Sequence, residues 1–151
     1  MQGSCLCGAI KYAVDSLDGP IVHCSCRTCR KTHAAAFVST VGVNREHFRW
    51  LKGQDKLRSF ESSPGKLRHF CSVCGSHLVA ERMHQAHVIL RVATLDDDPH
   101  KKPEMAIWRS HEVPWLDYLS PLPAFAEMPT STGSFLSDRP PCRHSSQRAG
   151  V

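Results

Sequence analysis

The sequence predicts a mainly β protein with little helix, and three features lead to this prediction. Many short segments are rich in β-branched and aromatic residues. Turn-forming Gly, Pro, Asn and Asp residues separate these segments. No long stretch keeps the ~3.6-residue apolar period of a helix. A chain of 151 residues with 41% hydrophobic content is long enough for one domain with its own core.

The expected elements follow one another as short strands with one helical stretch. Each aliphatic or β-branched run defines a strand and stops at a turn signal. The expected strands are 9–14, 21–23, 36–41, 57–60, 67–70, 78–81 and 87–92. The turn signals lie at 18–20, 43–44, 53–55, 63–65 and 97–99. Residues 27–35 lack helix breakers and are expected to form one or two helical turns, and Trp108 and Trp115 are expected in the core.

The C-terminal part differs in composition from the rest of the chain. From Pro121 onward, prolines, serines and threonines replace most aliphatic residues. Such a segment cannot bury enough apolar surface to offset its ordering entropy. We therefore expect a folded domain over residues 1–125 and a disordered Pro/Ser-rich tail over residues 126–151.

Charge and hydropathy narrow the class of protein. No segment approaches the ~20 apolar residues of a membrane span, and Met1 to Cys5 has neither the basic nor the apolar part of a signal peptide. We therefore expect a cytoplasmic protein without a membrane partner. The net charge of +5 suits an anionic ligand but is small for a nucleic-acid binder, so nucleic acid is not expected as a partner. In a reducing cytosol, the 8 cysteines are better candidates for metal ligands or catalytic thiols than for disulfides.

Seven of the cysteines fall into three groups, which are Cys5-Leu6-Cys7, Cys24-Ser25-Cys26-Arg27-Thr28-Cys29 and Cys71-Ser72-Val73-Cys74. A CxxC turn brings two thiolates to one zinc ion at about 2.3 Å, and a following glycine such as Gly75 eases the tight backbone path. A CxC pair is a weaker signal, because its side chains start about 7 Å apart on one face of a strand. The chain must turn there to bring both sulfurs to one metal.

Two partitions of these thiols are possible. A closed structural zinc site has four protein ligands, and a catalytic zinc site has three ligands and an open position. In the first partition, the closed site is Cys5, Cys7, Cys71 and Cys74, and the open site is Cys24, Cys26 and Cys29. In the second, Cys24 and Cys26 join Cys71 and Cys74, and Cys5, Cys7 and Cys29 are spare. Ligand type alone also allows a rubredoxin-type iron site.

The stretches that contain the three groups are Gly3 to Tyr12, His23 to Lys31 and Ser62 to Ser76. In this order, over about residues 2–120, they resemble the glutathione-dependent formaldehyde-activating enzyme family, also called the centromere-protein-V-type domain. The resemblance implies a β-tent fold of antiparallel sheets, stabilised by zinc. It also implies the four-plus-three partition, with two zinc ions per chain: a structural ion and a functional ion.

The resemblance further implies a carbon–sulfur lyase that joins or separates glutathione and formaldehyde, with S-(hydroxymethyl)glutathione as the adduct. Cys24, Cys26 and Cys29 would be its catalytic residues around the functional zinc. Alternatively, Cys26 could leave the metal and exchange with the incoming thiol. Ser25 departs from the family, because many members carry histidine there, and this leaves open a similar thiol or a related carbonyl as substrate.

A pocket for glutathione should be basic, because glutathione carries two carboxylates. Cations interleave with the middle cysteines or follow the turn at 63–65, in stretches without acidic residues, and an arginine offers a planar fork for a carboxylate. The expected substrate-binding residues are Arg27, Arg30, Lys31 and Arg68. His23, His33 and His69 lie near cysteines and are candidate proton shuttles.

The alternative function is a non-enzymatic module that uses zinc only for folding and binds chromatin or a protein partner. The basic balance of the chain favours this alternative, whereas the small size of the charge and the absence of a lysine run speak against chromatin. Cys142 lies outside every motif and is expected to be an exposed free thiol of the tail.

Overall fold

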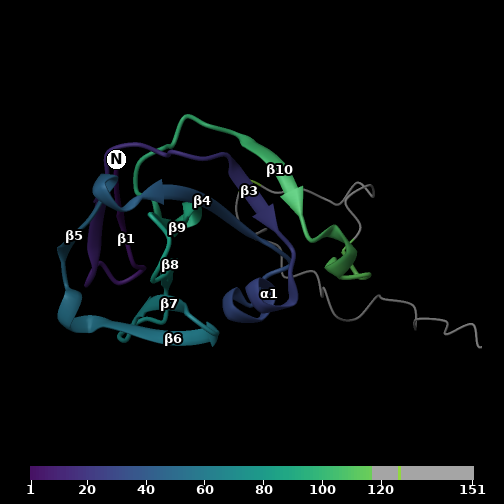
Figure 1. Ribbon diagram of the computed structural model, residues 1–151, viewed down its shortest axis with the longest axis horizontal. Helices are drawn as coiled ribbons and strands as arrows, with labels where there is room; N and C mark the ends of the chain where they lie inside the picture. The colour runs from purple at the N-terminus through teal and green to yellow at the C-terminus, as the bar shows by residue number, and fades with distance from the viewer. Residues whose placement is uncertain (117–125, 127–151) are drawn as a thin grey trace, which may run out of the picture. The chain divides into compact units, whose positions relative to one another are not determined.

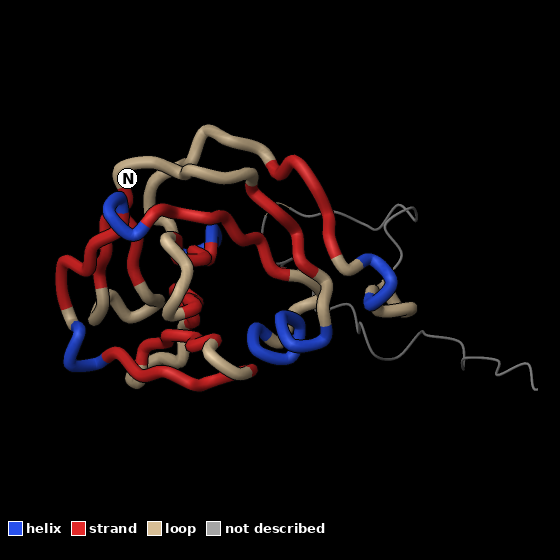
Figure 2. The backbone as a smooth tube through the Cα atoms, in the orientation of Figure 1, coloured by secondary structure: helices blue, strands red, loops and turns tan. Residues whose placement is uncertain are grey.

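The computed structural model describes residues 1–116 and residue 126, and the strands of this part form two sheets (Figures 1 and 2). The small sheet has three strands in the order β1-β2-β5. Its strands are β1 (Gln2–Ser4), β2 (Lys11–Val14) and β5 (Phe48–Lys52). Both pairings in this sheet are antiparallel.

The large sheet has seven strands in the order β10-β3-β4-β9-β8-β7-β6. Its strands are β3 (Ile21–Cys24), β4 (Val38–Asn44), β6 (Leu57–Ser63), β7 (Lys66–Cys71), β8 (His77–Arg82), β9 (His87–Arg91) and β10 (Pro103–Ile107). Neighbouring strands pair antiparallel, except that β10 lies parallel to β3.

Helical structure in the described residues consists of one α-helix and short 3-10 turns. The helix α1 (Arg27–His33) follows β3 directly and lies between β3 and the β6–β7 hairpin, where the large sheet curves (Figure 1). It ends at Ala34, whose φ of 48° is left-handed and whose N–H donates to the Arg30 carbonyl. The 3-10 turns are η1 (Arg45–His47), η2 (Gln54–Lys56), η3 (Val92–Thr94) and η4 (Arg109–His111).

The prediction of a mainly β fold with antiparallel sheets and little helix is confirmed. Every expected strand is present, with ends that differ by a few residues, and the expected helical turns form α1. Three strands were not expected: β1, β5 and β10. Of these, β1 and β5 form the small sheet with β2, so the sequence did not predict that sheet.

The main core combines side chains from both sheets. Tyr12 of β2 is fully buried together with Val43 and Leu90 of the large sheet. The Tyr12 hydroxyl shares a hydrogen bond of 2.8 Å with the Thr94 hydroxyl, and burial raises the pKa of Tyr12. Gly3 lies against this ring, since a Cβ there would approach Tyr12 Oη to 2.2 Å. The backbone of β1 can therefore pair with β2 only because residue 3 has no side chain.

Trp108 and Trp115 do not lie in the core, contrary to the prediction. Their side chains are 57% and 72% exposed. Trp108 directly follows β10, which is an edge strand of the large sheet. All five residues of β10 are exposed. Among the described residues no strand lies beyond β10 in that sheet, so no neighbouring strand covers the Trp108 ring.

The predicted tail lies outside the described residues except for Ala126, and so does Cys142. Within the described part of the chain, no helix has the length and apolar character needed to cross a bilayer.

Candidate metal centres and the adjoining cleft

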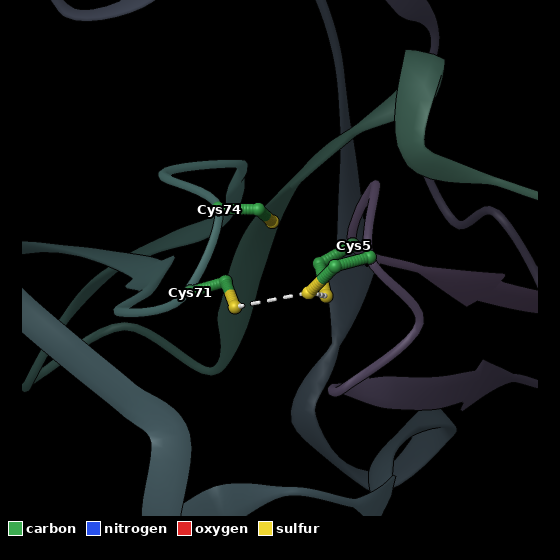
Figure 3. A group of neighbouring side chains, drawn as sticks. Cys5, Cys71 and Cys74 are labelled. Atoms are coloured by element: carbon green, nitrogen blue, oxygen red, sulfur yellow. Dashed lines mark hydrogen bonds between the residues drawn. The ribbon is translucent and has the colours of Figure 1, made fainter.

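Four cysteines from two separate turns meet where the small sheet joins the large one. Cys5 and Cys7 lie between β1 and β2, while Cys71 ends β7 and Cys74 lies in the turn to β8. Figure 3 shows the side chains of Cys5, Cys71 and Cys74 pointing toward one another. The ligand atoms of all four residues lie within 4.8 Å of one another. We call them the four-thiol cluster.

The sulfur spacing in the four-thiol cluster suits a tetrahedral zinc ion. The Sγ atoms of Cys5 and Cys7 are 3.5 Å apart, and those of Cys7 and Cys71 are 3.9 Å apart. Tetrahedral zinc with Zn–S bonds of about 2.3 Å requires sulfurs about 3.8 Å from one another. The cluster therefore fits a closed, four-coordinate metal site.

Glycines and a serine shape the turns that carry these thiols. Gly8 and Gly75 have φ values of 69° and 76°, so each cysteine pair turns through a residue in the left-handed region. The Ser76 hydroxyl lies 3.3 Å from Cys74 Sγ, and this hydrogen bond lowers the pKa of Cys74 to about 6. The Cys74 thiol thus favours the deprotonated form that metal binding needs.

The other three grouped cysteines come from one continuous segment. Cys24 ends β3, Cys26 is the N-cap of α1, and Cys29 lies in its first turn. Cys26 Sγ accepts a hydrogen bond of 3.4 Å from the Cys29 N–H, so the helix cap itself orients the Cys26 thiol. The three ligand atoms lie within 4.8 Å of one another, and no further histidine, cysteine or carboxylate of residues 1–116 joins them. We call them the three-thiol cluster, and its ligand count is that of an open metal site.

The surroundings of Cys29 favour its thiolate. The hydrogen bond from Cys24, followed by that from Cys26 and the charges of Arg68 and Arg91, lowers the pKa of Cys29 to about 5. The same hydrogen bond, together with burial, raises the pKa of Cys24. Arg68 Nη2 lies 4.0 Å from Cys29 Sγ, which places a positive charge directly beside the cluster.

A cleft of about 380 Å³ opens beside the three-thiol cluster. Its described lining contains five positively charged side chains and no carboxylate. These cations are Arg27, Lys66, Arg68, Arg82 and Arg91. Ile89, Ile107 and Trp108 form the apolar part of the wall. The cleft can therefore hold an acidic ligand next to the thiols.

Two of these cations are almost completely buried. Arg68 is 2% exposed and Arg91 is 3% exposed. Arg68 Nε donates to Ser62 Oγ at 2.8 Å, and neither arginine forms an ion pair with a carboxylate of the described residues. Burial lowers the pKa of Arg91 to about 10, so its guanidinium remains protonated at neutral pH. Two buried positive charges thus face the thiols without a carboxylate partner.

The structure brings only part of the predicted substrate-binding set to the cleft. Arg27 and Arg68 line it. Arg30 donates from Nε to the Ser25 carbonyl at 3.0 Å, Lys31 is exposed, and neither lines the cleft.

Several residues of the cleft were not expected from the sequence. Arg82, Arg91, Trp108 and His111 line it in addition to the predicted cations. Arg91 had a visible signal, because it is a charged residue at the end of an apolar strand. Trp108 and His111 had none, since they reach the cleft only through the pairing of β10 with β3.

The histidines predicted as proton shuttles lie elsewhere. His69 Nε2 is hydrogen-bonded to the Glu81 carboxylate at 2.7 Å, and His23 and His33 each pack against another ring. None of the three lines the cleft. Among the described residues, His111 is the histidine that does.

The fold and the two clusters define a mainly β protein with two candidate metal centres, one closed and one open. A family model identifies it further. Residues 1–111 match the model of the glutathione-dependent formaldehyde-activating enzyme, and the chain belongs to this family, as the sequence motifs predicted.

The fold is also similar to a crystal structure of a Rhodobacter sphaeroides protein solved as a Northeast Structural Genomics target. The TM-score is 0.59 at 23% sequence identity, and the match covers 70% of this chain and 98% of that chain. At this identity, the likeness shows a shared fold.

Proposed function

We propose that this protein is a zinc-dependent carbon–sulfur lyase that acts on the adduct of glutathione, or a similar thiol, with formaldehyde or a related carbonyl. Membership of the family supports a glutathione-related enzyme. The observation that carries the proposal is the three-thiol cluster beside a cationic cleft. The cluster offers an open metal position, and the cleft attracts an acidic thiol.

The proposed cofactors are two zinc ions per chain, which the soft thiolate donors suit. The structural ion would be held by Cys5, Cys7, Cys71 and Cys74, and the functional ion by Cys24, Cys26 and Cys29. The functional zinc, when bound, supplies an acceptor that lowers the pKa of the incoming thiol and favours its thiolate.

In the lyase direction, the adduct loses its hydroxyl proton, its oxygen forms the carbonyl double bond, and the carbon–sulfur bond breaks. The electron pair of that bond stays on sulfur, and a proton completes the thiol when it leaves. Arg68, 4.0 Å from Cys29 Sγ, stabilises negative charge on the sulfurs. We assign the proton exchange to His111, because its imidazole lines the cleft.

Substrate binding is assigned to the predicted cations in two ways. Arg27 and Arg68 would contact an acidic thiol in the cleft. Arg30 and Lys31 would attract it at longer range from α1. We also propose that residues 1–125 form the zinc-binding domain and that the protein works in the cytoplasm, where its described free thiols stay reduced.

Exchange NMR with 13C-formaldehyde and glutathione tests this function. We expect the wild type to exchange formaldehyde with its glutathione adduct faster than the spontaneous reaction. Cys26→Ser should abolish this acceleration and retain the metal of the four-thiol cluster. Arg49→Gln, an exposed change on β5, serves as the control and should retain the full rate.

A wild type that binds zinc at both clusters but exchanges formaldehyde only at the spontaneous rate would contradict the proposal. That result would favour the non-enzymatic binding module instead.

A further inference from the structure

Four buried side-chain nitrogens in the described residues have no hydrogen-bond partner. They are His33 Nε2, Arg68 Nη1, His77 Nδ1 and Arg91 Nε. Buried polar groups normally find partners, so a group of such atoms points to a missing polar ligand. Two of the four belong to arginines that line the cleft beside the three-thiol cluster.

The strand registers place both arginines on the same face of the large sheet as the Cys24 thiol. Arg91 pairs with Thr40, which pairs with Val22, and Cys24 lies two residues beyond Val22 on β3. Because side chains alternate along a strand, Arg91 and Cys24 share a face.

The same rule places Arg68 on this face. Arg68 pairs with Ala80, Ala80 pairs with Ile89, and Ile89 lies two residues before Arg91 on β9. Arg68 and Arg91 are thus fixed by the sheet toward one cleft, from strands that are separated only by β8.

The histidines of this group add no charge to the arginines. The rings of His33 and His77 lie 5.0 Å apart. Burial and the charges of the two arginines lower the pKa of both histidines, that of His33 to about 3. Neither histidine lines the cleft, so the positive charge there belongs to the arginines.

The charges around the cluster do not balance without a ligand. Three thiolates and one divalent zinc ion sum to −1. The cleft cations that are not exposed to solvent, which are Arg68, Arg91 and Lys66, sum to +3, while Arg27 and Arg82 are exposed. No carboxylate among the described cleft residues supplies the difference. A ligand that brings one thiolate and one carboxylate would supply −2 and balance this part of the site.

We infer that Arg68 and Arg91 together bind a carboxylate of the thiol substrate, so that the site selects thiols with a carboxylate within reach of both guanidinium groups. This inference rests on the proposed function, because it assigns the second anchor of the same substrate. The unpartnered Arg68 Nη1 and Arg91 Nε are the donors that the carboxylate oxygens would satisfy. Arg91 is therefore a substrate-binding residue in addition to the predicted Arg68.

Calorimetric titration of the zinc-loaded protein with matched ligands tests the inference. The probes are 3-mercaptopropionate, its uncharged amide, and propionate, which has no thiol. We expect the thiol acid to bind about ten- to a hundredfold more tightly than the thiol amide, as hydrogen bonds to a charged group should give. Arg91→Gln should bring this ratio to within about threefold of unity, and Arg68→Gln should act in the same direction.

The controls separate charge from fold. Arg49→Gln removes one positive charge on β5 and should keep the wild-type ratio. Circular dichroism and zinc content identify a variant that fails to fold. If Arg91→Gln does not fold, Arg91→Lys replaces it: lysine keeps the charge but lacks the planar fork, so the ratio of thiol-acid to thiol-amide affinity should fall only in part.

The outcomes distinguish this inference from the proposed function. Equal binding of the thiol acid and the thiol amide to the wild type, or an unchanged ratio in Arg91→Gln, would overturn the carboxylate site and leave the lyase proposal standing. Propionate binding that Arg91→Gln removes, without any gain from a thiol group, would support the carboxylate site and contradict the thiol chemistry.

Discussion

The four-thiol cluster links cysteines that lie 64 residues apart, from Cys7 to Cys71, whereas Cys26 and Cys29 of the three-thiol cluster are 3 residues apart. A cross-link stabilises a fold in proportion to the chain freedom that it removes from the unfolded state. A metal ion in the first cluster would therefore hold two sheets together, and one in the second would order only a short segment. With identical ligands, the first site would then serve stability, and the second would be free for the proposed chemistry.

The surroundings of the two clusters also differ in charge. The hollow beside Cys5 is lined by Ser4, Ser76 and Asp96 and by no cation of the described residues. The cleft beside Cys29 has arginines and a lysine in its wall. A ligand with negative charge is therefore attracted to the three-thiol cluster and not to the four-thiol cluster.

The largest expected effect comes from removing a thiol of the four-thiol cluster. Cys71→Ser should lower the free energy of unfolding by about 4 kcal/mol, the value for a cross-link that closes a loop of this length. Since single domains have about 5–15 kcal/mol in total, the variant should keep about 1–11 kcal/mol and unfold at a clearly lower urea concentration than the wild type. Urea titration followed by circular dichroism measures the loss. A midpoint equal to that of the wild type would show that this cluster does not hold the sheets together.

The three-thiol cluster should tolerate the corresponding change. Cys26→Ser should lose one metal equivalent and keep its fold, because serine is itself a good N-cap for α1. Cys26→Ala lacks the cap and should be about 1 kcal/mol less stable than Cys26→Ser. Metal analysis and thermal unfolding of the two variants separate ligation from capping. Equal stability of the two would mean that the side chain at position 26 does not cap the helix.

The smallest expected effect is on the pH dependence of stability and concerns His33, the last residue of α1. Burial, with the charges of Arg91, His77 and Arg68, lowers the pKa of His33 to about 3 in the folded protein from 6.5. Below pH ~6.5 the unfolded chain takes up a proton that the folded protein does not, so stability is lost as pH falls and is fully present above that pH.

Between pH 7 and pH 6 the wild type should lose about 0.7 kcal/mol more than His33→Gln. Unfolding titrations of both proteins at the two pH values measure this difference. Metal loss affects both proteins alike and cancels in the comparison. An equal pH dependence of the two proteins would contradict a buried, neutral His33.

The parts of the fold that the sequence predicted are those with strong local signals. The apolar runs of β3, β4 and β9 and the CxxC turn each specify their own conformation. The missed strand β5 carried a usable alternation, with Phe48 and Trp50 separated by Arg49, but its charged residues concealed it. The missed β1 is only three residues long and depends on Gly3 fitting over Tyr12, which no local pattern reveals.

The candidate site was predictable where its residues are neighbours in sequence. The thiols and Arg27 lie in short motifs, so spacing identified them as candidates, whereas the four-plus-three grouping of the thiols was implied by the family resemblance. Arg91, Trp108 and His111 come to the cleft through strand pairings between distant segments. Arg30 and Lys31 also lie close to Cys29 in sequence, but they are not among the residues that line the cleft.

The parallel pairing of β10 with β3 also sets an order of events during folding. Pro103 pairs with Ile21, so this contact closes a much longer loop than the hairpins of the large sheet. Contacts between distant segments form late, because the entropy of loop closure must be overcome first. The thiols of the three-thiol cluster all lie before β4, so they can meet early, whereas Ile107, Trp108 and His111 reach the cleft only after β10 has docked. The three thiols can therefore come together before the cleft beside them is complete.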